Sequence, residues 1–497
     1  MATSEQEPDE GNDTPNQKVD GALHLENRTP TDNRPHWADL IVPMVFQQGD
    51  NNLDPFDDEK PNATTDASSR KKVRGQIAQY AETVRIFQHR TFVLLVFVLG
   101  RRIRFTRWDH SGVSLTPLFD YFDEWQTTCK LFHRIASLAC SRGGVGVGYD
   151  SSATRLSQDD AFWEVMTSVS RPQTTDVDHT ERELADDELV KQDFVFKYVR
   201  TLFHDSLEKG PRYVLEVLDA PGSKTFRYIL VGSPVFHAPG VDRCGTRCYV
   251  GYDTTTMSFV WLKDTWRSDY PLLLREGDTL AALHAQGVRR IPTLVCHGDV
   301  RNQVTRTQDF YSDSGDALNS KFPPRKHKHY RLCTREIGLT LEKFLTPHQL
   351  VASIYDAAKA HSSAIKANIL HRDISGGNII IVPRVINNHR FRRLVWEGML
   401  IDWELAKRID MLHVRRQLWR TGTMQSMSVA MLLSSGKVSE VSDDLESFFY
   451  VLLYYLVRYV PSSFEEPEAV FHWLEDFFDS YAVQDNIYTC GAVKKNS

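Results

Sequence analysis

The sequence lacks a hydrophobic run long enough to cross a bilayer. Its strongest apolar run, Phe92 to Leu99 (FVLLVFVL), has about half of the roughly 20 residues that a membrane-spanning helix needs. The first residues, MATSEQEPDEGNDTPNQ, contain neither a basic nor an apolar segment, which excludes a secretory signal there. We therefore expect no membrane partner, and we interpret the apolar run as a buried β-strand.

The sequence also lacks a charge excess and a metal-binding cysteine pattern. Its formal net charge is -6 over 497 residues, so no global basic field points to nucleic acid. The seven cysteines are odd in number and show no CxxC spacing, which favours reduced thiols in the cytoplasm or nucleus over a disulfide scaffold. With 41% hydrophobic residues, the composition suits a globular chain of about two to four folding units.

Composition divides the chain into three regions. Residues 1–75 are rich in Asp, Asn, Pro, Thr and Glu, and we expect a disordered leader there. Residues 76–215 begin with an amphipathic segment and continue with alternating apolar and charged residues, which predicts a small α+β region. The acidic stretch 171–190 within it is expected to form a solvated loop. Residues 216–497 predict a separate domain.

The last region predicts strands first and helices later. Three successive strands are expected at 225–236, 246–253 and 258–264, and the spacing changes to helical at 270–286. The pattern then predicts three further strands and two helices: 331–337, 378–382 and 398–402 as strands, and 347–365 and 443–460 as helices. The helix at 443–460 is apolar almost all round, which predicts a position in the centre of a lobe.

The most specific motif is the octad at residues 371–378, His-Arg-Asp-Ile-Ser-Gly-Gly-Asn. It matches the H-R-D-x-x-x-x-N catalytic loop of protein kinases in residue type and spacing. Phosphoryl transfer needs a carboxylate that orients the attacking hydroxyl and accepts its proton, and we assign this role to Asp373. Asn378, five residues on, offers a side-chain oxygen to magnesium. A turn cap or a strand start would explain either residue alone, but not the whole octad.

A second motif, Leu400 to Glu404 (LIDWE), follows where kinases carry the D-F-G metal ligand. We predict that Asp402 binds a magnesium ion that bridges the phosphates of ATP. Trp403 is a tolerable replacement for Phe, whereas Glu404 replaces the Gly whose backbone freedom permits conformational switching. A strand-end Asp is by itself more often a cap than a ligand, so the assignment depends on its position after the H-R-D motif.

Four further residues are predicted to bind the nucleotide. Lys263, in the strand FVWLK, is expected to contact the α- and β-phosphates, and Glu276, at a helix start, to hold its ammonium group. Gly245 is the single well-placed glycine of a degraded phosphate-covering loop at 240–247. Glu336, near the end of the strand at 331–337, is assigned to the nucleotide as well. An exposed Lys and an exposed Glu are the plainer interpretation of the first pair.

The segment after these motifs carries no A-P-E. Asp444, at the start of the apolar helix, is expected to hydrogen-bond the catalytic-loop backbone. Thr423 and Ser426 are candidate phosphorylation sites, although exposed loop hydroxyls are usually not modified. Ser375 stands where Ser/Thr kinases usually place a lysine that neutralises the transferring phosphoryl group, which predicts slow turnover or unusual substrates.

The chain resembles the fungal-type protein kinase family, whose members share HRDIS-x-x-N, IDW or IDF, GT-x-x-x-MS and DDLES-F-Y-V-L. The resemblance covers most of 76–497 and includes the front region, through RWDHSG at Arg107 to Gly112 and GYD at Gly148 to Asp150. It implies a bilobal protein-kinase-like α+β fold, with a β-rich N-lobe at about 216–337 and a helical C-lobe at about 338–497. It also implies Ser/Thr-directed phosphorylation of a protein substrate with ATP and Mg²⁺. About 35 residues follow the last predicted helix, so we expect a compact or truncated C-lobe.

Three other functions stay open. The degraded glycine loop, Glu404 and Ser375 also fit a pseudokinase scaffold. A small-molecule phosphotransferase would share the Asp-to-Asn spacing and lack A-P-E, although the full H-R-D and an activation segment from Asp402 to about Ala430 favour protein substrates. Nucleic-acid binding through the basic residues 325–329 is least favoured, because the adjacent prolines and the short patch predict a solvated loop.

Overall fold

The computed structural model describes residues 19–497 apart from these gaps: 33–35, 50–52, 57–67, 185–193, 239–244, 271–273, 314–323, 388–391, 413–422, 435, 462, 464–465, 485–486, 491 and 497. The chain forms two compact units. Unit 1 comprises residues 1–171, 200–269 and 297–331, and unit 2 comprises 172–199, 270–296 and 332–497. The domain boundaries predicted at 215/216 and 337/338 stay predictions.

The first part of unit 1 is a six-stranded sheet with the strand order β1-β2-β3-β4-β5, in which β6 also pairs with β4. Its strands are β1 (Gly21–His24), β2 (Leu40–Gln47), β3 (Val93–Leu99), β4 (Arg102–Asp109), β5 (Gly112–Leu115) and β6 (Phe119–Asp120). β2 and β3 run parallel, so they need a crossover connection, and α1 (Ser68–Phe87) supplies it.

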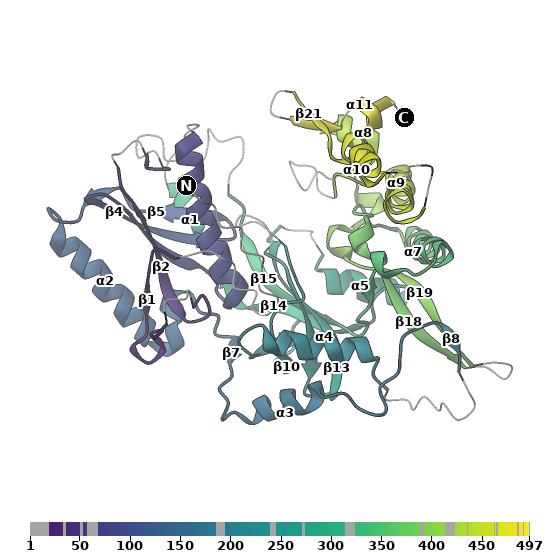
Figure 1. Cartoon of the computed structure of the whole chain (residues 1–497), viewed down its shortest axis with the longest axis horizontal. Helices are drawn as coiled ribbons and strands as arrows, with labels where there is room; N and C mark the ends of the chain where they lie inside the picture. The colour runs from purple at the N-terminus through teal and green to yellow at the C-terminus, as the bar shows by residue number, and fades with distance from the viewer. Residues whose placement is uncertain are drawn as a thin grey trace. The chain divides into compact units, whose positions relative to one another are not determined.

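β3 is buried on both of its faces. Successive side chains of a strand point to opposite sides, so Leu95 packs with Tyr80 of α1, whereas Val96 packs with Ile135 of α2 (Trp125–Cys140). Figure 1 shows α1 and α2 on opposite sides of this sheet. Two-sided burial explains why the run is apolar at every position, and the predicted strand is confirmed.

The structure differs from the leader expected over residues 1–75. Residues 1–18 lie outside the described part, but β1 and β2 belong to the sheet, and Trp37, Leu40 and Val45 are buried in its core. The expected disorder is therefore wrong for these strands. The polar composition of the whole segment concealed the short run LIVPMVF, which pairs with β3.

The second sheet of unit 1 has the strand order β14-β15-β13-β12-β10-β9-β7, and β11 pairs with β12. Its strands are β7 (Ala153–Arg155), β9 (Tyr213–Leu218), β10 (Phe226–Val231), β11 (Phe236–His237), β12 (Arg247–Asp253), β13 (Ser258–Ser268), β14 (Leu294–Val304) and β15 (His327–Thr334). The three successive strands predicted before the helix are confirmed as β10, β12 and β13, which pair antiparallel.

β15 shows that the loop expected at residues 325–329 is wrong from residue 327 onward. His327 and His329 are buried, while Lys328 is partly exposed and pairs with Asp269 at 2.8 Å. This alternation is that of a strand with one buried face. The basic charges concealed it, because buried histidines and exposed lysines look alike in a count of polar residues.

Two aspartates of the front region bind it to later segments of unit 1. Asp150, in the GYD motif, accepts a hydrogen bond from Nη2 of the fully buried Arg331 at 2.6 Å. Asp109, in the RWDHSG motif, accepts from the backbone N–H groups of Arg306 and Thr307 at 2.8 and 3.0 Å. Both motifs therefore hold unit 1 together.

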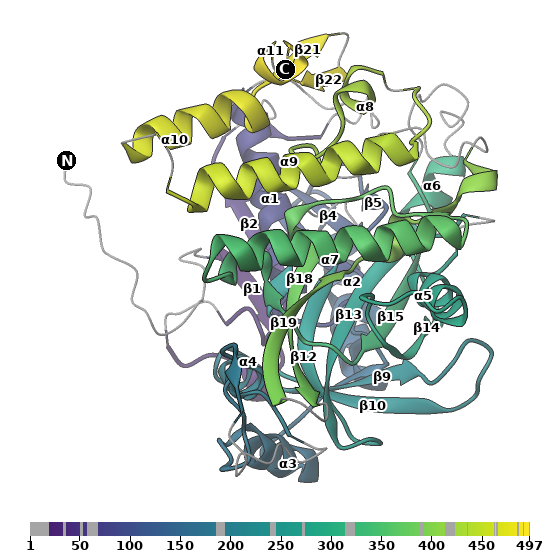
Figure 2. The same ribbon diagram turned by 90° about the vertical axis from the view of Figure 1, so that its right-hand side faces the viewer.

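Unit 2 places a long helix against a small sheet with the strand order β16-β18-β19-β8. Its main elements are α5 (Glu276–Ala285), β16 (Leu339–Thr340), α7 (Pro347–Lys366), β17 (Ile369–Leu370), β18 (Ile379–Asn387), β19 (Arg392–Leu400), α8 (Val429–Leu433), α9 (Val441–Tyr459) and α10 (Pro467–Leu474). A capping box of Thr346 and Gln349, with Pro347 in the first turn, fixes the start of α7. Figure 2 shows α7 between α9 and the strands β18 and β19.

Part of the acidic stretch 171–190 is built into this sheet and is not a solvated loop. β8 (Arg182–Glu183) pairs with β19. The Glu181 carboxylate accepts from the backbone N–H of Trp396 at 2.8 Å and from the Gln349 side chain at 2.6 Å. Residues 185–190 lie outside the described part. The expectation failed there because the Glu181 carboxylate has partners far away in the sequence.

α9 is also less buried than its composition predicts. Phe448 and Val451 are buried, but Leu445 and Phe449 are 54% and 58% exposed. The helix nevertheless contacts α7 on one side and α10 on the other, which agrees with the central position expected of it (Figure 2). In the described part of unit 2, only the expected burial all round is wrong. None of the described helices is long and apolar enough to cross a membrane.

We expect the substitution Asp150→Ala to lower the free energy of unfolding of unit 1 by about 3–5 kcal/mol, because it leaves the buried Arg331 cation without a carboxylate partner on that side. Asp123→Ala is the matched control, since Asp123 pairs with Arg101 but is 71% exposed, and it should cost about 1 kcal/mol or less. Urea unfolding of both variants checks this. Equal shifts of the two midpoints would contradict it.

A second expectation concerns pH. His89 is buried, and its Nδ1 accepts from Nη2 of Arg247 at 3.0 Å, so that nitrogen carries no proton. Burial and then Arg247 lower the pKa of His89 well below 6.5, although Asp264 opposes them. His89 therefore binds a proton in the unfolded chain at a pH at which it stays neutral in the folded chain. Its contribution to the free energy of unfolding is fully present above the His pKa of the unfolded chain, about 6.5, and is lost as the pH falls below that value.

The variant His89→Gln should lose less stability on acidification than the wild type. The difference in slope should approach about 1.4 kcal/mol per pH unit below pH 6, the value for one proton. Urea melts at pH 7.5, 6 and 5 measure it. Identical slopes would show that His89 is not the group that resists protonation.

Candidate active site

The octad 371–378 forms the loop between β17 and β18 in unit 2. Its backbone turns sharply at Arg372, whose φ is +74°. His371 is fully buried, and its Nε2 lies 3.0 Å from the carbonyl oxygen of Ile401. The His371 ring also meets the Trp403 ring edge-on at 4.6 Å. The catalytic loop and the LIDWE motif are therefore in direct contact.

Asp444 anchors this loop from the start of α9. Its Oδ2 accepts from the backbone N–H of Arg372 at 3.0 Å and lies 2.8 Å from Nε2 of His361 on α7. The predicted contact of Asp444 with the catalytic-loop backbone is confirmed. His361 was missed, although it falls on the same face of its helix as the buried Ile354 and Ala357, which is the signal that could have found it.

Asp373 and Asn378 lie side by side. Nδ2 of Asn378 donates to the carbonyl oxygen of Asp373 at 2.8 Å and to its Oδ2 at 3.1 Å. Both bonds use the amide nitrogen, so they leave Oδ1 of Asn378 as the atom that can face a cation. The loop thus orients the amide in the way that the predicted metal role needs.

Thr423 closes the other side of Asp373. Its backbone N–H and its hydroxyl donate to Oδ1 of Asp373 at 2.9 and 3.2 Å. The sequence pointed to Thr423 only as a phosphorylation site and missed this contact. Ser426 is buried and donates to the carbonyl oxygen of Ile374 at 2.7 Å, which makes it a poor site for modification. Residues 413–422 of the predicted activation segment lie outside the described part.

The surroundings of Asp373 raise the pKa of its carboxyl group. Burial raises its pKa, the nearby Asp402 carboxylate raises it further, and His371 and the bonds from Thr423 oppose the change; the net direction is upward. A carboxylate with a raised pKa accepts a proton more readily. The environment therefore favours the general-base role assigned to Asp373.

Asp402 lies among other carboxylates just after β19, with φ at +61°. The ligand oxygens of Glu276, Asp402 and Glu404 all lie within 4.8 Å of one another. The backbone N–H of Trp403 donates to Oε1 of Glu276 at 3.0 Å. Carboxylates this close repel one another unless a positive charge offsets them, and oxygen ligands are those that Mg²⁺ prefers. The donor set fits magnesium.

Glu404 belongs to this carboxylate group, which the sequence did not predict. The signal was present in the departure from D-F-G, where Glu404 brings a carboxylate as well as a loss of backbone freedom. Because a glycine offers no ligand atom, the replacement adds a third carboxylate to the group.

The remaining predicted residues are placed as follows. Lys263 lies on β13 in unit 1, is 8% exposed and pairs across the sheet with Cys248. Gly245, also in unit 1, has φ at +53°, a value that favours glycine, while residues 240–244 of the predicted phosphate loop lie outside the described part. The predicted pair of Lys263 with Glu276 stays a prediction.

Glu336 uses both carboxylate oxygens within unit 2. They accept from the backbone N–H and the hydroxyl of Thr293, each at 2.7 Å. A nucleotide contact at this position would therefore come from the backbone of residue 336. The predicted assignment itself stays a prediction.

An H-R-D loop joined to a strand-end Asp and anchored from a following helix is the arrangement of a kinase-like protein. Residues 203–456 match the model of the family described as fungal protein kinase, which is half of the chain, and the chain belongs to this family. No curated protein matches the chain. The solved structures similar to it include the "Structure of vaccinia related kinase 3", with 14% identity over 56% of this chain and 81% of that chain and a TM-score of 0.31. The mixed α+β fold is confirmed, and the division into two lobes stays a prediction.

We expect Asp444→Asn to loosen the catalytic loop. The amide oxygen can take the place of Oδ2 but carries no negative charge, so both contacts lose their charge assistance; hydrogen bonds to charged groups contribute about 1.5–3 kcal/mol. Hydrogen exchange of peptides that cover 369–378 should become faster, with a matching fall in the urea midpoint. Asp476→Asn, an exposed change in the same unit, is the control. Unchanged exchange in Asp444→Asn would rule out the anchoring role.

Proposed function

We propose that the chain is an ATP-dependent protein kinase directed at Ser or Thr hydroxyls. One observation carries the proposal: Asp373 is joined to Asn378 and to Thr423 by short hydrogen bonds, in a chain of the fungal protein kinase family. An aliphatic hydroxyl, that of Thr423, already lies 3.2 Å from Oδ1 of Asp373, which supports a hydroxyl acceptor at this carboxylate.

In this proposal Asp373 accepts the proton of the substrate hydroxyl as its oxygen attacks the γ-phosphorus of ATP, and the bond between that phosphorus and the leaving ADP oxygen breaks. Asn378 and Thr423 orient the carboxylate for this step. Lys263, Glu276, Gly245 and the backbone at Glu336 are the proposed nucleotide contacts.

Magnesium, when bound, neutralises charge on the phosphates, and we assign Oδ1 of Asn378 and the carboxylate of Asp402 as its ligands. The αL backbone at Asp402 turns its carboxylate toward Glu276 and Glu404, which supports this choice over a capping role.

Asp373→Asn tests the catalytic assignment. Purified protein with ATP and Mg²⁺ is expected to phosphorylate itself or a general protein substrate, and the variant should be slower by about 10²-fold or more, because the base is lost. Asp476→Asn is the matched control and should keep its activity. Equal rates for Asp373→Asn and wild type would remove Asp373 from the mechanism.

A pseudokinase scaffold is the second candidate, and Ser375 favours it. Ser375 is buried and bonds within the loop through its carbonyl oxygen, which accepts from the N–H of Asn378 at 3.1 Å. Because a serine side chain is uncharged, this position supplies no cation to the transferring phosphoryl group. Thermal melting separates the two candidates, because a kinase gains stability with ATP and Mg²⁺. If ATP and Mg²⁺ give neither a higher melting temperature nor turnover, the scaffold is the function that remains.

A further inference from the structure

A lysine near the end of the chain is fully buried in unit 2, and the proposed function does not use it. Lys494 lies on α11 (Ala492–Asn496), and its Nζ donates to the carbonyl oxygen of Gln425 at 2.7 Å. The same atom lies 4.1 Å from the centre of the Tyr450 ring and 5.7 Å from that of the Phe478 ring. Burial of an ammonium group is costly unless hydrogen bonds and aromatic faces replace the lost water. The carbonyl and the two rings offer that replacement.

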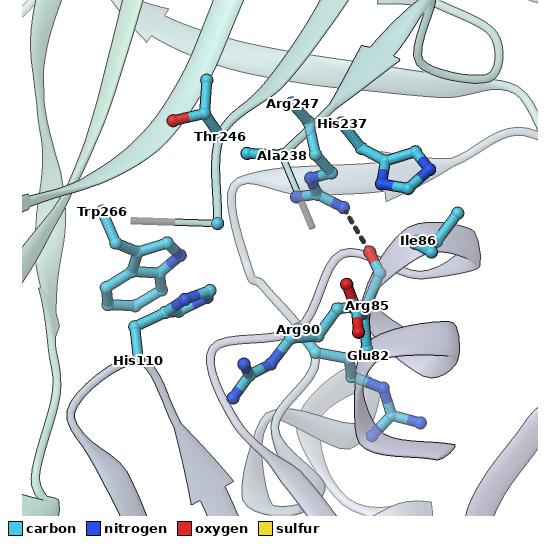
Figure 3. A pocket seen from close by; sticks show the side chains of 11 residues that line it. Glu82, Arg85, Ile86, Arg90, His110, His237, Ala238, Thr246, Arg247 and Trp266 are labelled. Atoms are coloured by element: carbon cyan, nitrogen blue, oxygen red, sulfur yellow. Dashed lines mark hydrogen bonds between the residues drawn. The ribbon is translucent and has the colours of Figure 1, made fainter. Parts of the chain in front are cut away.

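A buried cation that binds a backbone carbonyl can join two distant segments, and unit 1 contains a clear case. Arg247 donates through Nη1 to the carbonyl oxygen of Arg85 at 2.9 Å (Figure 3). This bond joins β12 to the end of α1, although the two residues are 162 positions apart. Lys494 and Gln425 are 69 positions apart, and their bond makes the same kind of link in unit 2.

The carbonyl group of Gln425 belongs to a short turn. The backbone N–H of Met427 donates to the carbonyl oxygen of Thr423 at 3.0 Å, which closes the turn around Gln425. The side chain of Gln425 also donates to Oδ1 of Asp479 at 3.1 Å, in an exposed position. The turn is therefore bound to later elements of unit 2 through both the backbone and the side chain of one residue.

The same turn also binds the catalytic loop. Thr423 donates through its N–H and its hydroxyl to Oδ1 of Asp373, at 2.9 and 3.2 Å. The buried Ser426 donates to the carbonyl oxygen of Ile374 at 2.7 Å. A displacement of the turn would break these bonds, and the Asp373 carboxylate would lose the two donors that hold Oδ1.

From this series of contacts we infer that Lys494 is a positioning residue for Asp373. Lys494 holds the turn at Gln425, and the turn in turn holds the donors of Thr423 against the carboxylate. The inference rests on the proposed function, which makes Asp373 the base. It adds that the end of the chain determines how this base is oriented.

Hydrogen exchange of Lys494→Met tests the link without any turnover. Methionine is also long and unbranched but donates no hydrogen bond, so amides in peptides that cover 421–428 should exchange about tenfold faster or more. Lys495→Met is the matched control, because Lys495 is exposed on the same helix, and it should exchange like the wild type. Lys494→Arg should restore protection, since a guanidinium group also donates to carbonyls and packs on aromatic rings.

The pH dependence of kcat/KM tests the effect on the base. Burial and Asp402 raise the pKa of Asp373, whereas the bonds from Thr423 lower it. Loss of these bonds should raise the pKa further, so the acid limb of the profile should move to higher pH in Lys494→Met and stay in place in Lys495→Met. We also expect kcat to fall about tenfold, with KM for ATP unchanged, because the base is misplaced.

Equal exchange in Lys494→Met and Lys495→Met would overturn the inference whether or not the chain is a kinase. A lower urea midpoint with an unmoved acid limb would also overturn it, because that is the result for a lysine that only stabilises unit 2. If Lys494→Met does not fold, Lys494→Gln is compared with Lys495→Gln in the same measurements. Absence of turnover in the wild type would contradict the proposed function, and the exchange data would still decide whether Lys494 holds the turn.

Discussion

Asp444 is the constraint on which the candidate site depends. Its carboxylate fixes Arg372 in a left-handed backbone conformation that L side chains adopt only where the surroundings enforce it. The same oxygen binds His361, so the two long helices of unit 2 and the catalytic loop meet at one atom. Asp373, which follows Arg372, takes its direction from this turn. The geometry at the proposed base thus derives from a residue at the start of another element, α9.

Much of the secondary structure could be predicted because local patterns determine it. The strand β3, the helix α7 and the pair β18 and β19 follow from periodicity and from turn residues. The predictions failed where tertiary partners outweighed composition. Glu181 and His329 read as solvated polar residues, yet each has a buried partner far away in the sequence, which a single-chain pattern does not reveal.

The candidate site follows the same rule. Spacing alone predicted that Asp373 and Asn378 lie together, because five residues of one loop fix their distance. The contact from Thr423 spans 50 residues, and Glu404 joins Glu276 across more than a hundred, so neither follows from local spacing. Motif order indicated Asp402 correctly as a neighbour of the loop. The partners that each motif residue acquires on folding could not be predicted from the sequence.

The bond between Asp150 and Arg331 has a consequence for biosynthesis. The two residues are 181 positions apart, and unit 1 is assembled from three separate stretches of the chain. On a ribosome, Asp150 emerges long before its partner is translated, while part of unit 2 is made in between. Until Arg331 is translated, the front region lacks the partner of the Asp150 carboxylate, and during this time chaperones have access to it.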